Sequence, residues 1–196
     1  VSGAINPGGK AVTIRGAIDA DGGPGTIIDG GGMIRVIQCV SGETPGTVFE
    51  NLRIRNGIAT TGGGMYIDQS SPTLSNCAFT GNSAEDGGGM RNYQSSPTVT
   101  SCTFTSNSAT DDGGGVHNYQ GGPIITDCTF TDNSSDSMGG GMYNTESSPS
   151  LTGCAFAGNS AIANGGGMFR VSVGRINFDG GSNCWLPAQG PSDACS

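Results

Sequence analysis

Apolar and polar residues alternate with a period of two in short stretches along most of this chain. Between residues 90 and 105, Met90, Asn92, Val99, Cys102 and Phe104 share one side, and the residues between them are mostly threonine. Glycines, β-branched residues and turn signals separate these stretches and disfavour a helix. The pattern therefore predicts three short strands, near 90–92, 98–100 and 102–105, joined by turns.

The same segment recurs with a fixed period. Gly triplets begin at residues 62, 87, 113, 139 and 165, and Cys-x-Phe pairs begin at residues 77, 102, 128 and 154. Both markers advance by 25 or 26 residues, and two independent markers with one period indicate a repeat architecture. Three short strands per repeat fit one coil of a parallel β-helix, whose coils stack about 4.8 Å apart. We therefore predict an all-β, single-stranded parallel β-helix with about 25–26 residues and three strands per coil.

Stacking of the coils would place like residues in inward columns. The expected apolar columns are Met65, Met90, Val116, Met142 and Met168; Leu74, Val99, Ile125 and Leu151; Cys77, Cys102, Cys128 and Cys154; and Phe79, Phe104, Phe130 and Phe156. Asparagines should stack at two corners, with Asn92, Asn118 and Asn144 at one and Asn82, Asn107, Asn133 and Asn159 at the other. The cysteine column is interpreted as small apolar packing, because Leu52 fills its position one coil earlier.

The repeat sets the expected domain boundaries. Regular coils span about residues 47–170, and looser coils are expected at residues 1–46, with an inserted loop at 39–47. Residues 1–183 are assigned to the β-helix as a whole. The chain starts at Val1 without a Met, so a mature form or an excised fragment is expected.

The last residues depart from the repeat completely. Residues 184–196, which include Trp185, are predicted to be a C-terminal cap, because a β-helix leaves an open edge that must be covered. We expect Cys184 and Cys195 to form a disulfide there, with two thiols as the alternative.

Each Cys-x-Phe pair is followed by an asparagine, which gives Phe-x-x-Asn, and each coil carries Gly-Gly-Gly-Met or Gly-Gly-Gly-Val. These segments resemble the FxxN and GGA(I/L/V) halves of the repeat of the chlamydial polymorphic outer membrane proteins and of related secreted bacterial β-helix proteins. The resemblance covers about residues 47–170, with glycine where that family usually has alanine. It implies a right-handed β-helix, an extracellular or cell-surface location and a role in adhesion.

The net charge of the chain argues against some classes of binding partner. The 196 residues carry 16 acidic and 8 basic side chains, a net charge of −8. Such an acidic chain is a poor partner for nucleic acid or an anionic membrane surface. No stretch reaches the roughly 18 apolar residues of a transmembrane helix, so none is expected.

Acidic residues recur at the corner before several Gly triplets. Stacked carboxylates could hold Ca²⁺, which prefers several oxygen ligands. We favour the simpler interpretation, a solvated acidic edge, and expect no cofactor. The candidate ligands for Ca²⁺ are Glu85, Asp86, Asp111, Asp112 and Asp136.

The outward side of the first strand in each coil gathers all four tyrosines and the single histidine. Aromatic rings offer apolar area together with a hydroxyl, which suits sugar faces. The alternative is a stripe of aromatic residues that only stabilises the sheet. The predicted ligand-binding residues are Tyr66, Arg91, Tyr93, His117, Tyr119 and Tyr143.

These residues favour a secreted or cell-surface module that binds a polysaccharide or a cell-surface receptor. The first alternative is a polysaccharide-active enzyme of the lyase or epimerase type, in which Arg91, Tyr93 and His117 supply a base and charge stabilisation. Glycoside hydrolysis needs two close carboxylates, and this face offers Asp68 with Glu146 nearby. The second alternative is ice binding by outward threonine pairs, Thr103 with Thr105 and Thr129 with Thr131.

Overall fold

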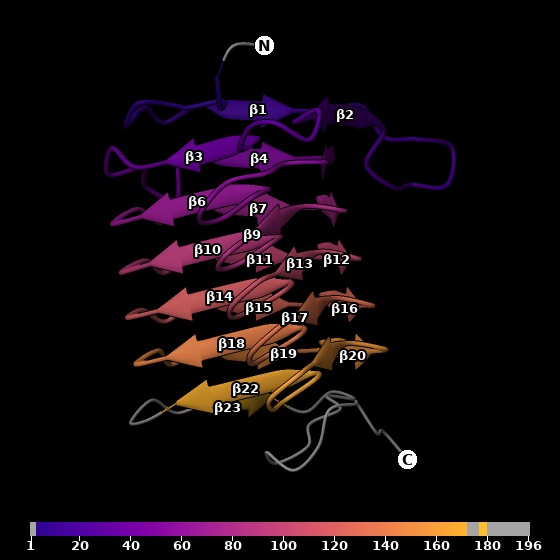
Figure 1. Ribbon diagram of the computed structural model, residues 1–196. Helices are drawn as coiled ribbons and strands as arrows, with labels where there is room; N and C mark the ends of the chain where they lie inside the picture. The colour runs from indigo at the N-terminus through magenta and orange to yellow at the C-terminus, as the bar shows by residue number, and fades with distance from the viewer. Residues whose placement is uncertain (1–2, 172–176, 180–196) are drawn as a thin grey trace.

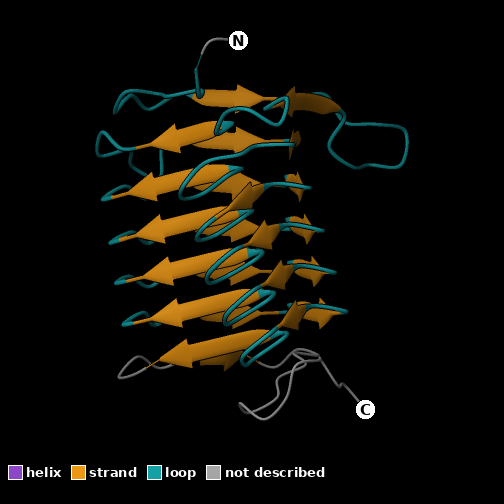
Figure 2. Cartoon of the chain, in the orientation of Figure 1, coloured by secondary structure: helices purple, strands orange, loops and turns teal. Residues whose placement is uncertain are grey.

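The computed structural model describes residues 3–171 and 177–179, and these form an all-β solenoid (Figure 1). Strands from successive coils stack along one axis, with loops at the corners (Figure 2). All pairings between neighbouring named strands are parallel, and they build four sheets along the axis. No helix of these described residues is long and apolar enough to cross a membrane.

Two of the sheets carry the first and second strand of each coil. Sheet 1 contains β3 (Ile37–Cys39), β6 (Met65–Asp68), β10 (Met90–Tyr93), β14 (Val116–Tyr119), β18 (Met142–Thr145) and β22 (Met168–Val171). Sheet 2 contains β1 (Thr13–Arg15), β4 (Val48–Glu50), β7 (Thr73–Ser75), β11 (Thr98–Thr100), β15 (Ile124–Thr126), β19 (Ser150–Thr152) and β23 (Asn177–Asp179).

The other two sheets complete each coil. Sheet 3 contains β2 (Thr26–Asp29), β5 (Leu52–Arg55), β8 (Ala78–Thr80), β12 (Thr103–Thr105), β16 (Thr129–Thr131) and β20 (Ala155–Ala157). Sheet 4 contains β9 (Ser83–Ala84), β13 (Ser108–Ala109), β17 (Ser134–Ser135) and β21 (Ser160–Ala161). The predicted parallel β-helix is therefore confirmed, but its regular coils have four strands rather than three. The fourth strands, which are Ser-Ala or Ser-Ser pairs, are too short for alternation to predict them.

The register is the one that the repeat predicts. Met90 pairs with Met65 on one side and with Val116 on the other, which are one repeat away in each direction. Phe104 is 1% exposed and stacks between Phe79 and Phe130, with ring centroids 4.8 and 4.9 Å away. The apolar and cysteine columns are buried in the same way.

Both asparagine columns exist and are buried. Within one of them, Asn107 donates from Nδ2 to Asn133 Oδ1 (2.9 Å) and to the carbonyl of Phe79 (3.0 Å). In the other column, Asn92 donates to Asn118 (2.7 Å) and Asn118 donates to Asn144 (2.8 Å). These bonds satisfy polar groups that would otherwise be buried without partners.

The Gly triplets allow the chain to turn back over sheet 1. Gly87 has φ +64°, a conformation that other residues rarely adopt. A Cβ on Gly88 would overlap the carbonyl of Ser108, and one on Gly89 would overlap the carbonyl of Gly115. Each triplet therefore combines one left-handed turn with two close backbone approaches to the next coil.

The inserted loop is shorter than predicted, because Cys39 belongs to β3 and the loop begins at residue 40. Glu43 anchors this loop and is buried, with only 2% of its surface exposed. Its carboxylate accepts hydrogen bonds from the backbone N–H groups of Gly9 and Ser41 (both 2.9 Å) and from the Ser70 hydroxyl (2.9 Å). A single buried charge thus connects the loop to the first residues and to the next coil.

The predicted cap at 184–196, with Trp185 and the Cys184–Cys195 disulfide, lies outside the described residues. No disulfide is present among the five described cysteines. Burial raises the pKa of the Cys102 thiol well above its usual range, as expected for a structural cysteine.

Candidate functional site

The outward residues of sheet 1 form two rows that run along the axis. In the first row, Tyr66, Arg91, His117 and Tyr143 are paired in register on β6, β10, β14 and β18. In the second row, two positions further along each strand, the paired residues are Asp68, Tyr93, Tyr119 and Thr145. The six predicted ligand-binding residues therefore do lie on one side of the same sheet.

The first row is largely covered by the turns that precede the strands. A Cβ on Gly113 would come within 2.8 Å of the His117 Cβ, so the glycine turn lies directly on the histidine. His117 is 5% exposed and Tyr143 is 6% exposed, and their rings meet edge to face at 4.7 Å. The prediction of one exposed face does not hold for these two residues, because the Gly triplets fold the chain back over them.

Arg91 is also bound within the protein. Its guanidinium forms an ion pair with Asp86 and donates from Nη1 to His117 Nδ1 at 2.7 Å. His117 Nδ1 also lies 3.2 Å from Asp86 Oδ1, so one ring nitrogen contacts both the guanidinium and the carboxylate. Burial lowers the pKa of His117, while the hydrogen bond to Asp86 acts to raise it. Nη1 of Arg91 therefore already has partners within the protein, whereas its buried Nε has no hydrogen-bond partner.

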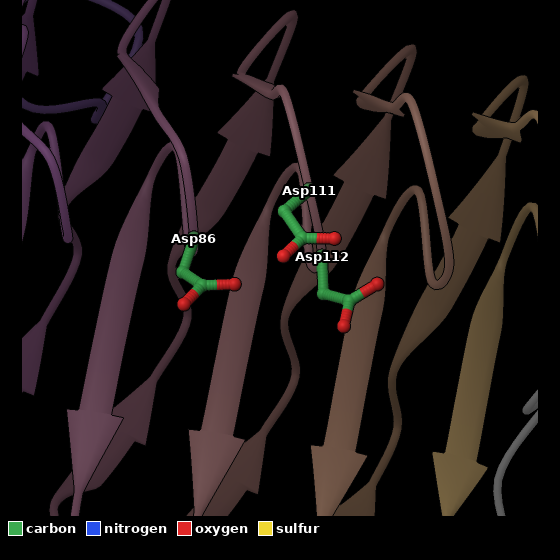
Figure 3. A group of neighbouring side chains, drawn as sticks. All are labelled: Asp86, Asp111 and Asp112. Atoms are coloured by element: carbon green, nitrogen blue, oxygen red, sulfur yellow. The ribbon is translucent and has the colours of Figure 1, made fainter.

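A ridge of carboxylates lies above the start of β10 and β14 (Figure 3). Asp86, Asp111 and Asp112 each place an oxygen within 4.8 Å of the others. Asp112 Oδ1 accepts the Met138 N–H at 3.0 Å, and burial, reinforced by Asp111, raises the pKa of Asp112. Burial acts to raise the pKa of Asp86, but His117 and Arg91 hold it below its usual range.

The expectation of no cofactor, with calcium at these carboxylates as the alternative, stays a prediction. Arg91 already neutralises Asp86, so a cation would compete with a guanidinium for that carboxylate. Glu85 and Asp136 are exposed and lie outside the group of close oxygens.

The second row is only partly covered, and each of its four residues keeps part of its surface exposed. Tyr93 and Tyr119 are half-buried and stack with ring centroids 5.0 Å apart and an angle of 17° between the rings. Next to them runs a column of longer polar side chains, in which Gln94 donates to Gln120 (2.8 Å) and Gln120 donates to Glu146 (2.5 Å).

The role of this polar column was not foreseen from the sequence. Each of its residues has positive φ and turns the chain at the end of a sheet 1 strand. Gln69, Gln94, Gln120 and Glu146 recur with the repeat period directly after the second row, and that recurrence is the signal that could have found them.

The threonine pairs of sheet 3 face outward as predicted. Thr103 pairs with Thr129 and Thr105 with Thr131, and the first two are exposed. Sheet 2 carries a second array of hydroxyl side chains. It includes Thr73, Ser75, Thr98, Thr100, Thr126, Ser150 and Thr152.

An open pocket of about 530 Å³, which no sequence pattern predicted, lies near the N-terminal coils. It is lined by Asp29, Asn56, Ile58 and Ser83 together with glycines. The carboxylate of Asp29 is bound by Arg55 (2.8 Å) and Asn56 (3.1 Å), so the pocket's charge is satisfied within the chain.

The family model described as "Right handed beta helix region" matches residues 8–185, which is most of the chain. No curated protein and no solved structure matches the chain.

Proposed function

This chain belongs to the family of right-handed β-helix proteins, and from that premise we propose that it is a binding module that holds a glycan against Tyr93 and Tyr119 on sheet 1. An extracellular or cell-surface location and a role in adhesion belong to the same proposal, supported by the repeat resemblance described above. The observation that carries it is the open, stacked tyrosine pair. Such rings offer apolar area and hydroxyls, and sugars present both apolar faces and hydroxyl groups.

The neighbouring polar column supports a sugar ligand further. The amides of Gln94 and Gln120 and the carboxylate of Glu146 run parallel to the tyrosine pair. Amides and carboxylates are ordinary hydrogen-bonding partners for hydroxyl groups. The row from Asp68 to Thr145 crosses four coils, so it spans about 14 Å and suits a short oligosaccharide.

Catalysis on the same face is less well supported. A lyase or epimerase needs a base that reaches the substrate. His117 is 5% exposed, and the Arg91 guanidinium is bound to Asp86 and His117. These residues hold the turn in place rather than facing a ligand.

A glycan-array screen tests the proposal, with a parallel assay for unsaturated uronate products. We expect binding without product. The variant Tyr93→Ala/Tyr119→Ala should weaken binding by more than about tenfold, or about 1.4 kcal/mol. Thr103→Ala/Thr129→Ala, which removes two side chains from sheet 3, should leave affinity unchanged. Equal effects of the two variants, or product formation, would contradict the proposal.

Ice binding is a second candidate, favoured by the in-register threonines of sheet 3. A thermal-hysteresis measurement tests it. Activity that Thr103→Lys abolishes, and that the double tyrosine variant leaves intact, would move the function to that sheet.

A further inference from the structure

We propose that the glycan held at Tyr93 and Tyr119 is cationic, a polysaccharide that carries free amino groups. This inference rests on the function proposed above and adds the chemical class of the ligand. Support for a cationic ligand comes from the set of charged side chains around the tyrosine pair.

A carboxylate lies at each end of the pair. Asp68 pairs with Tyr93 in register on the neighbouring strand β6. Thr145 pairs with Tyr119 on the other side, and Glu146 follows it directly and is exposed. The Asp68 Oδ1 atom is buried and has no hydrogen-bond partner. A carboxylate therefore flanks the tyrosine pair on the β6 side, and another flanks it on the β18 side.

The carboxylate ridge adds negative charge at the other end of the same strands. Asp86, Asp111 and Asp112 stand above the start of β10 and β14, and Tyr93 and Tyr119 end these two strands (Figure 3). The whole chain carries a net charge of −8, so no distant excess of positive charge offsets them.

Two of the guanidinium groups on this side are already bound within the protein. Arg91 pairs with Asp86 and donates to His117. Arg35 lies 4.9 Å from the centre of the Tyr66 ring and donates to the carbonyl of Thr61 at 2.7 Å. Arg170, on β22, pairs in register with Asn144 but is exposed, so it remains a positive group at the last described coil. Little positive charge is left to attract an acidic glycan.

An ammonium group matches this surface chemically. It donates three hydrogen bonds, and bonds between a charged donor and a carboxylate are among the strong ones in proteins. Ammonium groups also bind the faces of tyrosine rings. The negative surface would steer a cationic chain toward the site and repel a uronate chain.

The test compares ligands with one backbone. Oligomers of N-acetylglucosamine and fully deacetylated oligomers of the same length are titrated calorimetrically at about pH 6, above the ordinary carboxylate pKa values. A uronate oligomer is the negatively charged comparison. We expect the deacetylated oligomer to bind at least about tenfold more tightly than the acetylated one, a difference of about 1.4 kcal/mol. Its affinity should fall as salt is raised.

Charge-neutral variants locate the effect. Asp68→Asn/Glu146→Gln should weaken binding of the deacetylated oligomer about tenfold and weaken binding of the acetylated oligomer much less, because an amide still bonds to hydroxyl groups but carries no charge. The matched control is Asp127→Asn/Asp132→Asn, which removes two exposed carboxylates beside β16 on sheet 3. The control should keep full affinity.

The outcomes separate the two claims. Equal affinity for acetylated and deacetylated oligomers, with loss of both in Tyr93→Ala/Tyr119→Ala, would overturn the cationic ligand and leave the proposed function standing. Tighter binding of the uronate oligomer, or equal losses in the two carboxylate variants, would also overturn it. Absence of binding to every glycan in the screen would overturn the proposed function itself.

Discussion

Single side chains in this protein are stabilised mainly by their own counterparts one coil away. Phe104 contacts Phe79 and Phe130 in stacked geometry, and each cysteine of the column lies above another cysteine. A substitution at one position therefore disturbs both neighbouring coils. The sequence predicted these columns because each column repeats one residue type, or apolar residues of similar size, at the repeat period.

Phe104→Ala should lower the free energy of unfolding by about 3–5 kcal/mol, since it removes a buried ring from the middle of a stack. Thr103→Ala, its exposed neighbour on the same strand, should cost well under half of that. Denaturant midpoints of both variants check this. Equal shifts would contradict the inward assignment of Phe104.

The column cysteines should react with alkylating reagents only after unfolding. Cys77, Cys102, Cys128 and Cys154 are buried, and the Cys102 Sγ lies 3.3 Å from the carbonyl of Thr100. Mass spectrometry of the protein alkylated before and after denaturation is the measurement. Modification of the native protein at any of the four would show that the column is open to solvent.

Glu43 should make the N-terminal coils sensitive to acid. Burial alone would raise its pKa, but the N–H groups of Gly9 and Ser41 and the Ser70 hydroxyl hold it below the ordinary value of 4.5. Its contribution to stability is therefore fully present above pH 4.5 and declines as the pH falls through the lowered pKa of the folded state.

Glu43→Gln should remove this contribution, about 1–3 kcal/mol at neutral pH, because the amide cannot accept all three bonds. Urea unfolding at neutral and acid pH should then differ less in the variant than in the parent chain. Glu85→Gln, at an exposed position, serves as the control. An unchanged difference would mean that Glu43 does not contribute.

Among the elements, alternation located the strands of sheets 1, 2 and 3 to within a residue or two, because most of these strands bury every second side chain. Alternation did not predict the strands of sheet 4, because two residues are too few to show a period. It did not predict the path of the glycine turns either. Alternation marks which side a residue such as His117 faces, but not whether another turn covers that side.

Gly88→Ala should be strongly destabilising, because its Cβ would overlap the backbone of Ser108 and Gly114 and backbone cannot move aside. A cost of about 1–3 kcal/mol or more is expected from overpacking. Gly122→Ala, whose Cβ would lie 3.4 Å from the nearest atom, should be close to neutral. Thermal unfolding of both variants decides, and similar melting temperatures would show that the coils are not in close backbone contact there.

At the scale of the whole molecule, the repeat predicted the architecture and left the activity open. Core and corner residues recur because every coil needs them, so they carry no information about a ligand. The candidate site is instead a departure from the repeat. Tyr93 and Tyr119 occupy a position where the neighbouring coils have Asp68 and Thr145, and the stacked pair forms only because two adjacent coils share the same aromatic residue.

The chain contains four tyrosines, which allows the central claim to be tested residue by residue. Ring resonances of isotopically labelled tyrosine, assigned by single Tyr→Phe variants, are followed by NMR while the glycan that binds most tightly in the screen is added. The signals of Tyr93 and Tyr119 should shift, while those of Tyr66 and Tyr143 stay in place. Shifts confined to Tyr66 and Tyr143, or no shift of any tyrosine on saturation, would show that the ligand does not bind at the open tyrosine pair.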